Sequence, residues 1–317
     1  MIDAHWLYLL LGAMFAAVAV ASARDRTNPR RFGNAGFWGL IAVSFWFGDR
    51  IGDLANGALV LALVGLAGTR LIGRGSAEIT TPGERAASSR RFGNRLFLPA
   101  LIIPAAAFAG TILFSYTPLS NSGLIDPKAV TLVLLGAGTL IALAVCLAWF
   151  RAPLTAPVEE GRRLLDAIGW AVVLPQMLAA LGTVFAAAGV GSAVGAIAAH
   201  LLSPGSIFLA VLVYALGMAL FTIIMGNAFA AFPVMAAAIG IPVLVQADGG
   251  NPAVIGAVGM LAGFCGTLLT PMAANYNIVP VALLNLRNQY AVIRAQVGTA
   301  LPLLAFNIAM LYFAGFR

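Results

Sequence analysis

The sequence predicts an all-α polytopic membrane protein. Of its 317 residues, 61% are hydrophobic and only 9% are charged, and the mean hydropathy is +0.97. Several apolar runs approach or exceed the roughly 17 residues that a helix needs to cross the hydrocarbon core. The 35 glycines and 16 prolines are ordinary in packed or interrupted membrane helices. We therefore expect about seven full spans, one re-entrant helical hairpin and one discontinuous helix.

Five of the expected spans lie in residues 1–150, which form an N-terminal membrane region. Trp6 and Tyr8 stand at the start of the first span, where aromatic side chains anchor helices at the membrane interface. A tight polar turn with Asp49, Arg50 and Asp53 separates the second span from the third. The five spans are expected at 2–22, 35–47, 54–72, 96–114 and 129–150.

A five-residue sequence occurs twice in this region. Arg-Arg-Phe-Gly-Asn stands at 30–34 and again at 90–94, each time just before an expected span. Asparagine is a favoured N-cap, so each copy predicts a helix start with its arginine pair in the loop. Two similar cytoplasmic helix starts explain this more simply than a duplicated hairpin.

A charged, proline-containing linker at 151–163 separates this region from a C-terminal region at 164–317, which the interruptions described below predict to be one repeat of a carrier. This region begins with a span at 164–188 that is interrupted by Pro175-Gln176. The apolar stretch 190–202 is too short to span, so we expect an interfacial arm helix there. The remaining elements are a hairpin at 206–241, a discontinuous span at 252–285 and a last span at 295–314.

The hairpin is predicted from an interruption in a long apolar stretch. Gly226-Asn227-Ala228 divides residues 206–241, and Pro233 follows in the second part. The stretch is either one broken span or two half-helices that meet at the glycine. The re-entrant form places 15 of the 18 Lys and Arg residues in cytoplasmic loops, against 14 for the crossing form. The positive-inside rule therefore favours the re-entrant form, with the N-terminus outside.

The second interruption lies at 263–280. Two glycines and two prolines occur there together with threonines and asparagines. Proline removes a backbone donor, and freed backbone groups at membrane depth are tolerated where they line a cavity. A kinked helix with small residues for close packing is the simpler alternative. Because this break follows the hairpin so closely, we expect the two to form one solute site.

The chemistry of the two breaks suits a small anion. Half-helix N-termini attract carboxylates, and exposed carbonyls near Gly226 and Gly266 would suit Na+, the expected coupling ion if there is one. No other cofactor is expected. Thr222 and Thr270 could instead bond back to helical carbonyls. The candidate substrate-binding residues are Gly226, Asn227, Gly266, Thr267, Thr270, Asn275 and Asn277, with Thr222 and Gln176 as secondary candidates.

Other functional classes lack support. No P-loop, H-E-x-x-H or G-x-S-x-G motif is present, so we do not expect an enzyme. Cys146 and Cys265 both lie in apolar runs, which argues against a disulfide framework or a metal site. The net charge of +7 comes from loops between spans, so membrane orientation explains it without nucleic acid.

The sequence resembles two known groups of membrane proteins. The order of kinked span, arm, hairpin and discontinuous helix over 161–317 resembles one inverted repeat of the ion transporter superfamily. Over nearly the whole chain, the motifs at 226–233 and 266–280 resemble the larger subunit of the bacterial 5-oxoproline (pyroglutamate) transporter family. The superfamily often has Ser-Asn-Thr at the hairpin tip, whereas this chain has Gly226-Asn227-Ala228, so hydroxyl contacts expected there are absent.

The resemblance implies a subunit of a secondary carrier in the bacterial cytoplasmic membrane that takes up 5-oxoproline, a small ring with an amide and a carboxylate. The site chemistry suits this solute and would also suit many other small carboxylates. It implies half of an inverted-repeat carrier, paired with a smaller sister membrane subunit; a homodimer is the alternative. Spans 1 to 5 show no second pair of breaks, which agrees with half a carrier. A carrier for another small organic anion and a non-transporting membrane scaffold or assembly subunit remain open.

Overall fold

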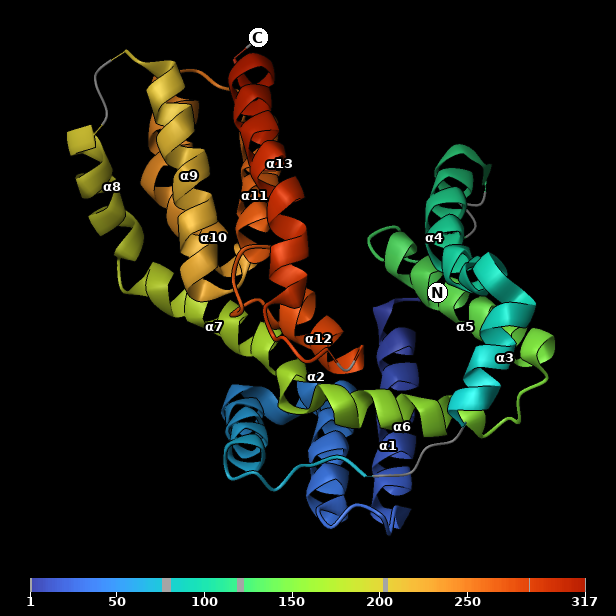
Figure 1. Cartoon of the computed structure of the whole chain (residues 1–317). Helices are drawn as coiled ribbons and strands as arrows, with labels where there is room; N and C mark the ends of the chain where they lie inside the picture. Colours follow the sequence, from blue (N-terminus) through green and yellow to red (C-terminus); the bar gives the residue numbers. More distant parts are fainter. Residues whose placement is uncertain (1, 76–80, 119–122, 202–204, 285, 317) are drawn as a thin grey trace. The chain divides into compact units, whose positions relative to one another are not determined.

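Helices make up nearly all the regular structure of the chain (Figure 1). The computed structural model describes residues 2–75, 81–118, 123–201, 205–284 and 286–316. In these ranges, β-pairing is confined to one isolated bridge between Ile2 and Ile125, and eight helices are long and apolar enough to cross a membrane. The prediction of an all-α, multi-pass membrane protein is confirmed. The chain divides into two compact units, Met1–Gly169 and Trp170–Arg317.

The first unit consists of helices that pack mainly in pairs. Helix α1 packs against α2 and α6, and α4 packs against α5. The helices are α1 (Ala4–Arg24), α2 (Arg31–Gly68), α3 (Pro82–Phe92), η1 (Gly93–Phe97), α4 (Leu98–Tyr116), α5 (Val130–Phe150) and α6 (Ala156–Ile168).

Helix α2 joins the second and third expected spans. A kink lies within the polar turn predicted between them, at Gly52, whose φ of 74° interrupts the helical geometry. Glycine adopts this left-handed conformation without the steric cost of a side chain, so the chain changes direction without a loop.

The repeated pentapeptide does not cap helices as predicted. Arg30 is the N-cap of α2, and Asn34 lies within the first turns, where its Nδ2 donates to the Gly73 carbonyl and its Oδ1 accepts from the Gly73 N–H. In the second copy, Asn94 lies inside η1 and Phe97 is the N-cap of α4. The N-cap prediction is wrong: the amide of Asn34 is taken up by the Gly73 backbone, and Asn94 lies within a 3-10 turn that precedes α4.

The expected linker at 151–163 is largely helical. Pro157 at the start of α6 fixes a helical φ, and Glu159 in the first turn complements the helix dipole. One face of α6 buries Arg162 and Asp166. The functional boundaries at 150 and 163 stay a prediction, since division by packing does not test them.

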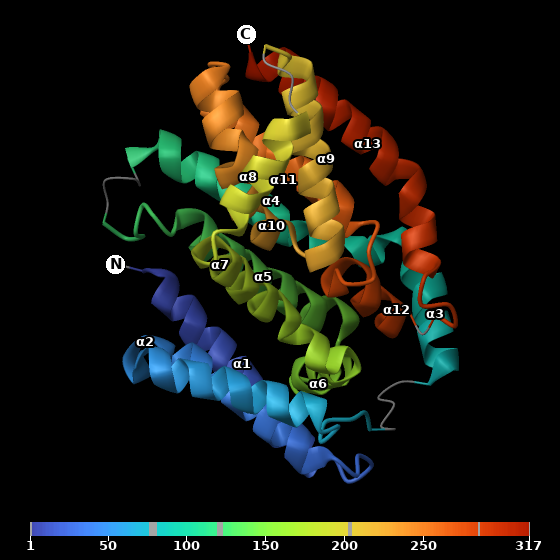
Figure 2. The same cartoon turned by 90° about the vertical axis from the view of Figure 1, so that its left-hand side faces the viewer.

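The second unit carries the predicted arm, hairpin and break. Figure 2 shows α9, α10, α11 and α13 gathered together, and α9, α11 and α13 contact one another. The helices, after η3 (Gly169–Val172), are α7 (Leu174–Ala187), α8 (Val190–Leu201), α9 (Ile207–Met225), α10 (Ala228–Met235), η4 (Ala236–Ala247), α11 (Pro252–Thr267), η5 (Ala274–Ile278), α12 (Val279–Leu283) and α13 (Ala291–Gly315).

Helices α9 and α10 form a hairpin. Gly226 ends α9 in a left-handed conformation with φ 76°, and its N–H donates to the Thr222 carbonyl. Asn227 then caps α10 by accepting from the Phe229 N–H. The returning arm continues through the wider π-helical turns of η4 past Pro242, where an ordinary α-helix would be disrupted. The arm therefore runs to Ala247, beyond residue 241.

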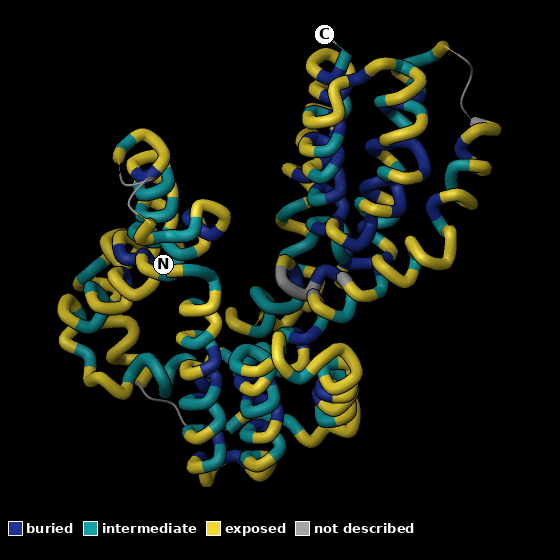
Figure 3. Tube along the Cα trace, turned by 180° about the vertical axis from the view of Figure 1, so that it is seen from behind, coloured by how far each residue is buried: buried dark blue, intermediate teal, exposed yellow. Residues whose placement is uncertain are grey.

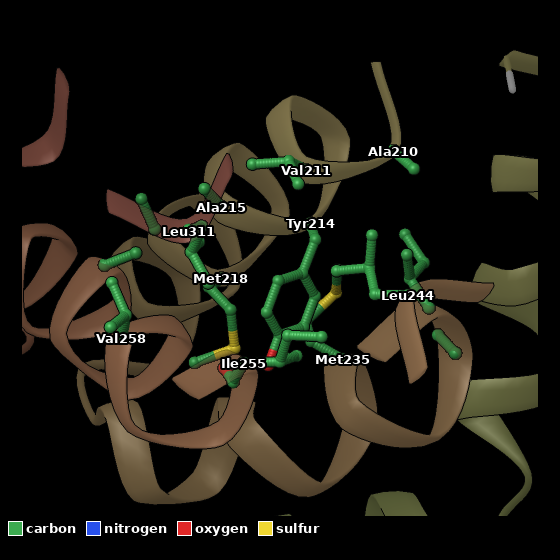
Figure 4. Close-up of a cluster of buried hydrophobic side chains, with 14 of the residues drawn as sticks. Ala210, Val211, Tyr214, Ala215, Met218, Met235, Leu244, Ile255, Val258 and Leu311 are labelled. Carbon is green, nitrogen blue, oxygen red and sulfur yellow. Dashed lines mark hydrogen bonds between the residues drawn. The ribbon is translucent and has the colours of Figure 1, made fainter. Parts of the chain in front are cut away.

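The core of this unit surrounds Tyr214 (Figure 4). In Figure 3 the buried positions of this unit concentrate on the inward sides of its helices. Tyr214 is completely buried, and a Cβ at Gly240 would lie 3.1 Å from its ring. Gly259 on α11 is closer still. Glycines at these two positions let η4 and α11 approach the ring, which fixes α11 against the hairpin.

Candidate functional site

The hairpin tip lies directly against the break that follows α11. A Cβ placed on Gly226 would lie 2.6 Å from the Met272 carbonyl oxygen and 2.7 Å from its carbon. No side chain fits in that space, and the positive φ also favours glycine. The two interruptions that the sequence predicted to be one site are therefore in contact.

The hydroxyl of Thr270 links the two interruptions. Its Oγ1 donates to the Ile223 carbonyl at 2.8 Å and accepts from the Met272 N–H at 3.2 Å. Ile223 is in the last turn of α9, where carbonyls have no intrahelical donor. Thr270 thus caps the first arm of the hairpin from the broken segment instead of bonding back to its own helix.

Asn277 holds the two edges of the break together. Its Nδ2 donates to the Thr267 carbonyl at 2.9 Å and to the Thr270 carbonyl at 2.6 Å. The residue is 1% exposed, and its Oδ1 has no hydrogen-bond partner among the described residues. A buried amide oxygen without a partner costs free energy, so this atom is an acceptor available to a ligand.

The other candidates on α9 and α11 serve packing and local bonding. Thr222 donates to the Met218 carbonyl and Thr267 to the Phe264 carbonyl, each within its own helix. Both threonines are buried. A Cβ on Gly266 would overlap the Ala219 backbone, so this glycine sets the close approach of α11 to α9.

Two further candidates lie at the margins. The side chain of Asn275 is outside the described residues, although its backbone belongs to η5. Gln176 is exposed on α7, a helix that contacts α10 and η5. Its side chain makes none of the bonds that join the tip to the break.

The arrangement presents donors and acceptors of complementary kinds at one place. The N-terminus of α10 carries backbone N–H groups and partial positive charge, and it starts at the tip beside Met272. The end of α11 contributes carbonyls, and Asn277 contributes an amide oxygen. In this structure Thr267, Thr270 and Asn277 are shielded from solvent, each at 2% exposure or less. The hairpin tip and the break thus pack against each other with these side chains away from solvent, and we call this the closed arrangement.

Two backbone carbonyls at the site and one buried charged cluster in the first unit were not predicted from the sequence. Nothing in the residue types marked the carbonyls of Ile223 and Met272 as contacts. In the first unit, Arg162 binds Asp25 at 2.6 Å and Asp166 at 3.5 Å, and all three residues are at most 9% exposed. Trp38 Nε1 also donates to Asp166 at 2.9 Å. The spacing of Arg162 and Asp166 by four residues was a signal for their pairing, but nothing pointed to Asp25.

Burial works to raise the pKa of Asp25, but hydrogen bonds from Thr27 and the nearby Arg162 outweigh it and hold the pKa below its ordinary value. The Thr27 backbone N–H and hydroxyl both donate to Oδ1 of Asp25, while Arg162 donates to Oδ2. This carboxylate is thus ionised and bonded on both oxygens at neutral pH.

Comparison with known proteins gives one family. A family model described as "Protein of unknown function (DUF979)" matches residues 5–316. No curated protein and no solved structure matches. The match covers both compact units and both interruptions of the second unit.

Proposed function

We propose that this chain, which belongs to the DUF979 family of proteins of unknown function, is a subunit of a secondary active transporter for a small carboxylate. The expected solute is 5-oxoproline, and the expected location is the bacterial cytoplasmic membrane. The observation that carries the proposal is the contact between the hairpin tip at Gly226 and the broken segment at Met272. Interrupted helices that meet within apolar surroundings are typical of solute sites in carriers.

The site chemistry supports a ring that carries both a carboxylate and an amide. The N-terminus of α10 would face the carboxylate, since free N–H groups and the helix dipole favour an anion. The Oδ1 of Asn277 would accept from the ring N–H of the solute. Carbonyls near Gly226 and Gly266 would hold Na+ if the carrier is sodium-coupled.

Binding requires the closed arrangement to open. The polar groups of the break are buried, and Thr270 bonds to the first arm of the hairpin. A solute reaches them only when Gly226 moves away from Met272. We therefore propose that the hairpin alternates between this closed contact and an open, solute-accepting one, and that the Thr270–Ile223 hydrogen bond helps to define the closed state.

A complete carrier of this type would need a second repeat. The second unit carries one hairpin and one break, and the proposal therefore includes a smaller sister membrane subunit, or else a second copy of the chain. Uptake of labelled 5-oxoproline tests both parts. Cells that express the chain with its genomic neighbour should accumulate the label. No uptake by either the pair or the chain alone, with both proteins present in the membrane, would contradict the proposal.

Asn227 offers a sharper test of solute contact. Asn227→Ser keeps a side-chain oxygen that can cap α10, whereas Asn227→Ala removes both the cap and the amide. If the amide contacts the solute, both variants lose uptake, although the serine variant keeps wild-type thermal stability. Normal uptake by Asn227→Ser would show that the residue serves only as a cap.

A membrane scaffold is the second candidate, and one observation favours it. The hydroxyls of Thr222, Thr267 and Thr270 are all bonded to backbone carbonyls in the closed structure. In a scaffold, a cysteine at 270 would remain unreactive to aqueous reagents whether or not solute is present. In a carrier, its reactivity would change when the solute is added, because opening exposes this position.

A further inference from the structure

The two copies of Arg-Arg-Phe-Gly-Asn have different surroundings. In the first copy, Asn34 is bonded to the Gly73 backbone, Arg30 donates to the Ile72 carbonyl, and Gly33 lies against Leu71. In the second, a Cβ on Gly93 would meet no atom within 4 Å. Arg90, Arg91, Asn94 and Arg95 are all exposed. The same five residues therefore hold a loop in place in the first copy, whereas in the second copy, which we call the open copy, they are largely exposed.

The open copy lies beside an aromatic platform. Phe92 packs edge-on against Phe150, with ring centroids 5.1 Å apart, and against Trp149 at 6.3 Å. Trp149 and Phe150 are stacked on each other at the C-terminal end of α5. Trp149 is 37% exposed and Phe97 is 68% exposed. Rings of this kind at a helix end are typical of the membrane interface.

The same place has a strong excess of positive charge. Arg90 and Arg91 lie in the last turn of α3, Arg95 in η1, and Arg151 caps α5 beside Phe150. Glu84 is the one acidic residue in 81–97 and 145–154, and its carboxylate is bonded to Thr81 at the far end of α3. The dipole of α3 explains why basic residues stand in its last turn. It does not bury them, and the side chains of Arg90 and Arg91 are exposed.

We propose that Arg90, Arg91, Arg95 and Arg151, with the Phe92–Trp149–Phe150 platform, bind the headgroup of an anionic phospholipid. The guanidinium groups pair with the phosphate, and the rings lie at the level of the glycerol backbone and upper acyl chain. A free phosphate would use only the charges, whereas the exposed rings beside them favour a lipid. This binding does not depend on which solute the chain carries.

The test is native mass spectrometry of the full chain in detergent, titrated with phosphatidylglycerol and with phosphatidylcholine of the same acyl chains. The wild type should retain phosphatidylglycerol in preference. Arg90→Gln/Arg91→Gln should weaken that binding about thirtyfold, because each basic residue near an anionic surface raises the affinity about fivefold. Arg26→Gln/Arg31→Gln is the matched control: it removes the exposed Arg26 and the partly buried Arg31 from the first basic loop and should have little effect. Arg31 stacks on Phe32 as Arg91 stacks on Phe92, so the control also removes one such contact.

Equal retention of the two lipids would overturn the proposal, as would equal weakening by both double variants. A second measurement locates the lipid even if a variant folds poorly. Brominated phosphatidylglycerol should quench a fluorescence component that is absent from Trp149→Phe, and brominated phosphatidylcholine should quench that component less. Competition by glycerol phosphate at the same concentration would show that the site takes free phosphate and would overturn the lipid assignment.

Discussion

The hydroxyl of Thr270 has a role that the chemically similar hydroxyl of Thr222 lacks. Thr270 caps a carbonyl at the end of another helix, while Thr222 bonds within its own helix. Met218 O also has its ordinary helical donor, whereas Ile223 O is in the last turn of α9. Both threonines are buried, so the two sites differ mainly in what the hydroxyl bonds to.

Thr270→Val should therefore destabilise the second unit by about 1–3 kcal/mol, the cost of leaving a buried carbonyl without a donor. Thr222→Val, the matched control, should cost about 1 kcal/mol or less. Thermal unfolding of both variants in detergent measures the difference. Equal losses of stability would show that the Thr270–Ile223 hydrogen bond adds nothing beyond an ordinary buried hydroxyl.

The ionised carboxylate of Asp25 gives a prediction about pH. Its pKa is lower in the folded protein than in the unfolded chain, so its contribution to stability is complete above the unfolded value of about 3.9. That contribution decreases as the pH falls below this value and through the folded pKa. The stability difference between wild type and Asp25→Asn should thus be constant from pH 7 to about pH 5 and shrink in stronger acid.

Unfolding followed by circular dichroism between pH 3 and 7 measures this difference. Asp53→Asn serves as the control, since Asp53 is exposed and has none of these bonds, and its difference from wild type should stay small throughout. A gap for Asp25→Asn that widens in acid would have the wrong sign and would contradict the assignment of Asp25 as an ionised partner of Arg162.

The sequence was informative about side chains where residue type and neighbours agreed. Asn227 next to a glycine between apolar runs marked the tip of a turn, and it caps α10 there. Asn34 misled because its amide pairs with Gly73, a partner 39 residues away that no local pattern reveals. The Asp25–Arg162 pair, separated by 137 residues, was hidden for the same reason.

The packing of α11 against α9 depends on glycine. A Cβ on Gly266 would overlap the backbone of Ala219, which cannot move without shifting α9. Gly256 on the same helix has Phe232 as its nearest neighbour, at 3.8 Å, which is ordinary contact. The two glycines thus differ in the space around them, although both lie in one apolar helix.

Gly266→Ala should destabilise the protein by about 1–3 kcal/mol through overpacking, while Gly256→Ala should be neutral or slightly stabilising. Thermal unfolding in detergent compares them directly, independently of any transport assay. If Gly266→Ala is as stable as Gly256→Ala, α9 and α11 do not approach as closely as the structure shows.

Helix existence was easier to predict than helix boundaries. The apolar runs identified the helices, because a chain segment in lipid must satisfy its own backbone hydrogen bonds, and a helix does so within the segment. The junction between the second and third spans lies where it was predicted, but it is a kink at Gly52 within α2 and not a loop. The segment 151–163 was predicted to be a linker because of its charged residues. Much of it belongs to the amphipathic helix α6, whose charged residues Arg162 and Asp166 are buried on one face. The extent of the second hairpin arm depends on π-helical turns, for which the sequence has no clear signal.

The topology of the chain follows from its hairpin and its charges taken together. Helix α9 has 19 residues and is about 28 Å long, comparable to the hydrocarbon core of a bilayer. The returning arm, Ala228–Ala247, has 20 residues. Each arm is therefore long enough to cross, so the hairpin is either re-entrant or made of two crossing arms. Both of these forms return the chain to the side from which it entered, unlike the single broken span considered from the sequence. They therefore place the flanking loops on the same sides of the membrane, with 15 of the 18 Lys and Arg residues in cytoplasmic loops.

Cysteine labelling tests this return. In a Cys146→Ala/Cys265→Ala background, single cysteines replace Ser206 before α9, Asp248 after η4, and Gln289 before α13. With the basic loops in the cytoplasm, 206 and 248 should react with an impermeant maleimide in intact cells, and 289 only after permeabilisation. A cysteine at 227 then separates the two forms: crossing arms place it near the cytoplasmic face, where labelling requires permeabilisation, and a re-entrant hairpin holds it at membrane depth. Labelling of 206 and 248 from opposite sides would exclude both forms, and with them the meeting of hairpin tip and helix break on which the transport proposal depends.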